Sequence, residues 1–176
     1  MSLINSFEKK VKELEVKFLE AKNSYDNFQK VNSEFSKGRK SLNDYQNELK
    51  IFKLKTDAIN NIVYLALEEL KGGDKSQIVT LLAYLSIRER YFRSGYIKEK
   101  ICKALKKVDF NNEEQQLLTK IIVDNITTAG REFGELIKLV PKVKKQEILT
   151  MINELKNTDQ DYIQKRINKI RGFLDI

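Results

Sequence analysis

Apolar residues recur at alternating steps of four and three along the first 35 residues, interrupted only at Asn32. This spacing puts one apolar stripe on a helix and is typical of helices that pack along a heptad seam. The first seam consists of Phe7, Val11, Leu14, Phe18, Ala21, Tyr25, Phe28, Asn32 and Phe35. A second seam follows, formed by Leu42, Tyr45, Leu49, Phe52, Thr56, Ile59, Val63, Ala66 and Leu70.

The two seams are out of phase across residues 36–39, a stretch without apolar side chains that contains Gly38. Ser41 and Asp44 follow it as helix-start residues. Both seams span 28 residue steps. We therefore predict a coiled-coil-like antiparallel helical hairpin over residues 1–73, not one continuous rod. The aromatic residues of the two seams present more apolar surface than two paired helices can cover. We therefore expect the hairpin to pack on the rest of the chain or on a second copy.

Shorter amphipathic patterns follow the Gly72-Gly73 pair, which is a helix stop. They predict three helix pairs that begin near residues 75, 112 and 145. Recurrence at such an interval is typical of an α-solenoid, and an orthogonal helical bundle explains it equally well. The predicted class is therefore all-α, with a hairpin domain over residues 1–73 and a bundle or short helical-repeat domain over residues 74–176.

Two local features of the second domain are specific enough to test. The first of its helices is expected to run from about Lys75 to Arg93, with Glu89 on the apolar face and paired with Arg93 one turn later. Asn111 and Glu114 have the spacing of a capping box and predict another helix start.

The net charge of +8 is concentrated in residues 74–110, which carry nine basic and four acidic side chains. Tyr91, Phe92 and Tyr96 stand among these charges, as in surfaces that bind phosphate or acidic proteins. The simpler interpretation is a lysine-rich chain with solvated helix faces. The candidate partner-binding or phosphate-binding residues are Arg88, Arg90, Arg93, Lys100, Lys103 and Lys107. The last three share one side of a predicted helix, because their spacing is helical.

The chain has no histidine and one cysteine, Cys102, which removes most familiar catalytic arrangements. Ser-His-Asp and Cys-His sites and ordinary zinc sites need residues that are absent. The GGDKS sequence at residues 72–76 lacks the spacing of a phosphate-binding loop. We expect no catalytic residue, cofactor or metal, and a magnesium site built from carboxylates alone is the remaining enzymatic alternative.

These observations favour a non-enzymatic helical interaction or scaffold protein that binds a macromolecular partner, either another protein or a second copy. The alternative is a sequence-independent nucleic-acid-binding protein that contacts backbone phosphates through residues 88–107. No apolar run is long enough to span a bilayer, and the N-terminus lacks the apolar region of a signal peptide. With a single cysteine, these features lead us to expect a cytoplasmic location.

Overall fold

The structure is a computed structural model that describes residues 2–128, 130, 132–155 and 160–175. Within these ranges the regular elements are eight α-helices and one 3-10 helix, and no strand occurs there. The elements are α1 (Leu3–Ser36), α2 (Leu42–Lys71), α3 (Gln77–Ser86), α4 (Ser94–Leu105), α5 (Asn112–Thr128), α6 (Phe133–Leu136), η1 (Ile137–Lys142), α7 (Lys145–Glu154) and α8 (Asp161–Phe173). The predicted all-α class is confirmed.

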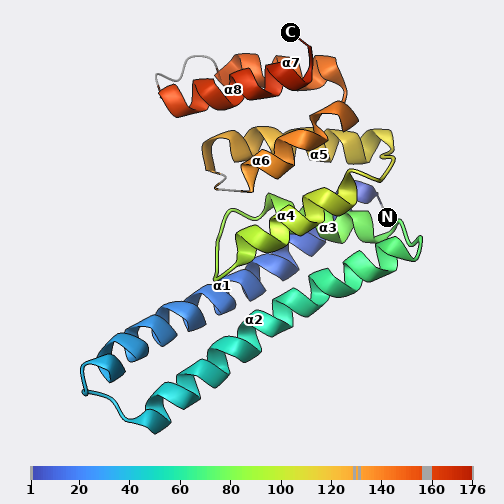
Figure 1. Cartoon of the computed structure of the whole chain (residues 1–176). Helices are drawn as coiled ribbons and strands as arrows, with labels where there is room; N and C mark the ends of the chain where they lie inside the picture. Colours follow the sequence, from blue (N-terminus) through green and yellow to red (C-terminus); the bar gives the residue numbers. More distant parts are fainter. Residues whose placement is uncertain (1, 129, 131, 156–159, 176) are drawn as a thin grey trace.

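The first two helices form the predicted antiparallel hairpin, which extends to the lower left of Figure 1. The chain reverses after α1 at Gly38, whose φ of 69° lies in the left-handed region that favours glycine. Ser41 then caps α2: the Asp44 amide donates to Ser41 Oγ at 3.1 Å, and the Ser41 amide donates to Asp44 Oδ2 at 3.1 Å. A glycine turn followed by this reciprocal cap explains why the phase of the apolar pattern changes here.

The remaining helices stack as successive pairs above one half of the hairpin: α3 with α4, then α5 with α6, then α7 with α8 (Figure 1). The first helices of these pairs begin at Gln77, Asn112 and Lys145, close to the predicted positions. The capping box before α5 is also present, since Asn111 and Glu114 exchange hydrogen bonds of 2.8 and 3.0 Å. The predicted pairing of the helices is therefore confirmed.

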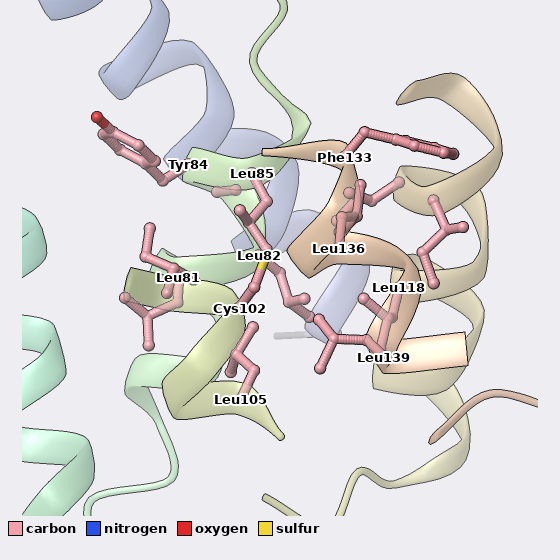
Figure 2. Packing of buried hydrophobic residues seen from close by; sticks show 14 of the residues in the cluster. Leu81, Leu82, Tyr84, Leu85, Cys102, Leu105, Leu118, Phe133, Leu136 and Leu139 are labelled. Carbon is pink, nitrogen blue, oxygen red and sulfur yellow. The ribbon is translucent and has the colours of Figure 1, made fainter. Parts of the chain in front are cut away.

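One continuous hydrophobic core connects the hairpin to the stacked pairs. On the hairpin side, the Phe18 ring packs on Tyr84 of α3 with 4.8 Å between ring centroids. Further in, Leu81, Cys102 and Leu136 are among the side chains that converge between α3, α4 and α6 (Figure 2). The hairpin therefore docks against the rest of the chain through the half that lies nearer the stack. Its division into a separate domain at residue 73 stays a prediction.

The connection between α3 and α4 differs from the expectation, because α3 ends at Ser86 and does not continue to Arg93. Glu89 lies in this connection with its side chain exposed, so it neither faces the core nor forms a helical ion pair with Arg93. The reason is tertiary. The Tyr91 hydroxyl donates to Asn60 Oδ1 of α2 at 2.6 Å and lies 2.7 Å from the Tyr84 hydroxyl. A non-helical connection lets Tyr91 reach these partners. The contacts it gains stabilise the fold more than continuation of the helix would.

Candidate interaction groove

An open groove of about 760 Å³ lies between the last turns of α2 and the C-terminal half of α4. The two helices contact each other, and both rise toward the right in Figure 1. The lining has an apolar floor and a charged rim. The floor consists of Tyr64, Leu67, Leu70, Ala104 and Val108. The rim consists of Glu68, Lys71, Lys100, Lys103 and Lys107, and we call the whole feature the lysine-rimmed groove.

The floor of the lysine-rimmed groove is anchored in the core of the protein. Leu67 and Val108 are members of the core cluster and remain 8% and 9% exposed. Leu70 and Ala104 are partly buried and pack against the same cluster. Because these side chains are held from beneath, the floor is a preformed apolar surface that can cover an apolar group of a ligand.

On one side of the rim, Lys100, Lys103 and Lys107 follow α4 and its C-terminal end, and we call these three residues the lysine row. All three are exposed, and no acidic side chain in the described part of the chain pairs with them. Lys100 Nζ lies 5.0 Å from the centroid of the Tyr64 ring on α2, a cation–π contact that connects the two walls. The lysine row therefore presents its positive charge to any molecule that enters the groove.

The α2 side of the rim is less positive, because Lys71 Nζ pairs with Glu68 Oε1 at 2.7 Å. Both side chains of this pair are about two-thirds exposed, so the pair contributes little to stability. The groove thus has a strongly positive wall on α4 and a nearly neutral wall on α2.

The three candidate arginines do not line the groove, so the structure brings together only half of the predicted residues. Arg88 is exposed in the connection before α4. The Arg93 guanidinium lies over the Phe92 ring, 5.0 Å from its centroid. Arg90 Nη2 donates to the Thr128 carbonyl at 2.8 Å and pairs with the buried Glu132 at 3.1 Å. Arg90 therefore has a structural partner at the end of α5.

Lys98 is a basic residue of the same segment that belongs to the core, with 2% of its surface exposed. Its ammonium group donates to the Ile87 carbonyl. Burial lowers the pKa of Lys98 to about 8, although the nearby Glu132 carboxylate acts in the opposite direction. Lys98 is three and seven positions before the buried Ile101 and Leu105, so these residues share one face of α4. The inward position of Lys98 could therefore have been predicted from the apolar pattern of the sequence.

Cys102 lies on the same inward face of α4 and is fully buried. Burial raises the pKa of its thiol to about 12, with the Glu135 carboxylate as the next contribution. A thiol that is protonated and shielded from solvent is a small core residue, not a nucleophile.

Neither a metal centre nor a membrane span accompanies the groove in the described part of the chain. No cluster of three or more candidate ligand side chains there could hold a metal ion. None of the described helices is sufficiently long and apolar to cross a bilayer. Comparisons of the chain with models of protein families, with curated proteins and with solved structures find no match. The chemistry that the groove offers is burial of an apolar group beside a row of ammonium groups.

Proposed function

We propose that this chain is a non-enzymatic helical interaction protein that binds a macromolecular partner in the lysine-rimmed groove. The observation that carries the proposal is the preformed apolar floor beside a row of lysines without acidic partners. Covering an apolar floor gives affinity, because it removes apolar surface from water. Unpaired lysines at the rim give orientation and a faster encounter with an acidic partner.

The outer face of the hairpin supports an interaction role as well. Ile51, Leu54 and Leu65 of α2 are 45%, 67% and 60% exposed. At 100° per residue they fall on the side of α2 away from its seam with α1. Exposed apolar residues on one stripe of a long helix are a surface that another helical protein can cover.

The test compares two variants that change the net charge equally. In the row-reversal variant, all three members of the lysine row become glutamate. In the control-reversal variant, Lys9, Lys12 and Lys30, which are exposed on α1, become glutamate. Each protein is cross-linked in a cell lysate, and the captured proteins are quantified by mass spectrometry against the wild type.

We expect one set of proteins to be captured by the wild type and the control-reversal variant and to be lost from the row-reversal variant. Because outward lysines contribute little to stability, the melting temperatures of all three proteins should agree closely. Equal capture by the three proteins would show that the groove is not the binding site.

Sequence-independent binding of nucleic acid is the second candidate, because Lys71 and the lysine row surround one groove. If each member of the row contacts one duplex phosphate, the three together add about 2.7 to the magnitude of the log–log salt slope. The measurement is a titration of duplex and single-stranded oligonucleotides at increasing salt. The candidate is supported if the wild type binds and its salt slope exceeds that of the row-reversal variant by this amount. It is rejected if the wild type does not bind at low salt.

A further inference from the structure

We propose that the occupant of the lysine-rimmed groove is an acidic amphipathic helix of a partner protein. This inference rests on the proposed function and specifies the class of partner. It follows from three properties of the groove: the spacing of the lysine row, the shape of the apolar floor, and the unequal charge of the two walls.

The lysine row matches the repeat of a second helix. Lys100 and Lys107 are seven positions apart, about 10 Å along the axis of α4 and of the turn that follows Leu105. Carboxylates at positions i, i+3 or i+4, and i+7 of a helix that lies along α4 have the same rise and lie on one side of that helix. Each ammonium group of the row can therefore meet one carboxylate without a change of backbone on either side.

The floor provides the apolar half of the match. Two neighbouring helices leave a groove between them, and a third helix can pack its side-chain ridges into it. In helix-in-groove recognition, the ligand contributes apolar anchors at i, i+3 or i+4, and i+7. Tyr64, Leu67 and Val108 form a floor that such anchors would cover. An acidic edge beside this apolar stripe would then face the lysine row.

The unequal walls distinguish this ligand from other anions. A nucleic-acid backbone has phosphates on its outside and offers no apolar side chain to cover the floor. A fatty acid or a lipid has an apolar tail, but its single head group cannot engage lysines spread over about 10 Å. The α2 wall is nearly neutral because Lys71 pairs with Glu68, so it does not attract a ligand that is negative on all sides. An amphipathic helix with acids along one edge satisfies both walls.

The experiment selects the ligand without assuming its sequence. A displayed library of random peptides of about 16 residues, long enough for more than four helical turns, is selected on the full-length protein. Each round includes counter-selection on the row-reversal variant. We expect the enriched peptides to be acidic, with apolar residues at helical spacing. Enrichment of neutral or basic peptides, or the absence of any enrichment, would overturn the inference.

The best peptide is then titrated by fluorescence anisotropy against a set of variants. Relative to the wild type, the row-reversal variant should weaken binding by about tenfold or more, and the control-reversal variant by less than about threefold. The same peptide with lysine in place of its acidic residues should prefer the row-reversal variant, because the charges are exchanged across the interface. Failure of this exchange would show that the row does not contact the acidic residues.

A second variant tests the floor independently of charge. Ala104 is partly buried and lines the floor, so Ala104→Trp would fill the groove and leave the lysine row in place. We expect this variant to lose most peptide binding with its helical circular dichroism intact. If it does not fold, the exchange of charges remains a sufficient test on its own. Undiminished binding by a folded Ala104→Trp protein would place the peptide outside the groove.

Two further measurements separate a failure of the acidic-helix inference from a failure of the proposed function on which it rests. Oligonucleotides and vesicles of anionic lipid serve as the competing probes, and binding of either one that depends on the lysine row would overturn the acidic-helix inference. If no peptide binds but row-dependent capture from lysate persists, the inference fails and the proposed function stands. If row-dependent capture is also absent, both fail.

Discussion

Basic side chains of residues 88–107 serve two different purposes, structural contacts with the rest of the fold and an exposed positive surface. In residues 88–98, Arg90 binds the Thr128 carbonyl at the end of α5 and the Glu132 carboxylate before α6, and Lys98 donates to the Ile87 carbonyl inside the core. In residues 100–107, Lys106 pairs with Glu135 at 2.8 Å, whereas the lysine row is exposed and has no acidic partner in the described part of the chain. The number of basic residues in a stretch of sequence therefore does not give the charge of the surface that the stretch forms.

The difference comes from the position of each residue relative to the core. Lys98 follows the period of the inward face of α4, whereas Lys100 and Lys103 fall outside it. A buried ammonium group loses hydration and must receive hydrogen bonds in return. An exposed one keeps its hydration and stays available for a ligand. The three predictions below test this contrast, in order of decreasing effect.

The largest effect is expected from the same substitution at two positions of one helix. Lys98→Glu removes the donor to the Ile87 carbonyl and puts a second buried acid close to Glu132. Its cost should exceed about 4 kcal/mol in the free energy of unfolding, whereas Lys103→Glu should change it by less than about 0.5 kcal/mol. Urea denaturation followed by circular dichroism measures both. Similar losses at the two positions would contradict the distinction between the buried and the exposed lysines of α4.

An intermediate effect is expected at Arg90. Arg90→Ala leaves the buried Glu132 without this partner, which should cost about 1–3 kcal/mol, because half of the Arg90 side chain is already in water. A methyl group at Gly130 would lie 2.4 Å from Arg90 Nη1, so Gly130→Ala should displace the same guanidinium. In a double-mutant cycle, Gly130→Ala should therefore cost clearly less in the Arg90→Ala background. Additive losses would show that the two residues act independently.

The smallest effect is a pH dependence that originates at Lys98. Its pKa is about 8 in the folded chain and 10.5 for an ordinary lysine, so the unfolded state holds more protons between these values. The free energy of unfolding should therefore rise by about 1 kcal/mol between pH ~8 and pH ~9. Above pH ~9 the buried Cys102 acts in the opposite direction, because its raised pKa means that the unfolded thiol loses its proton first.

Denaturant unfolding at several pH values measures this dependence, and Lys98→Met is the matched variant. Methionine keeps most of the apolar stem and has no titratable group, so the rise with pH should disappear in this variant. A wild-type protein whose stability falls steadily from pH ~7 upward would contradict a depressed pKa at Lys98.

Several features could be predicted from the sequence because short-range physics decides them. The phase change at Gly38 and the Ser41 cap identified the reversal between α1 and α2, since both depend on residues within about two helical turns. The Asn111–Glu114 pair likewise marked the start of α5. The grouping of the lysine row followed from helical spacing alone.

Other features depended on contacts between residues far apart in the chain. Tyr91 ends the helical pattern after α3 by reaching Asn60 of α2, and this partner has no local signature. The same holds for Arg90, whose carboxylate partner lies 42 residues later at Glu132. The sequence therefore could not separate the arginines that the fold employs from the lysines that it leaves exposed.

The sequence by itself determined the order of the helices, the reversal between α1 and α2, and the side of α4 on which the lysine row lies, because periodicity and capping act within one or two turns. Only the tertiary structure decided that the end of α2 lies beside α4. The floor joins Tyr64–Leu70 to Ala104–Val108, so it exists only after the hairpin has docked on α3 and α4. A groove between two helices is a property of their relative placement, which long-range packing decides.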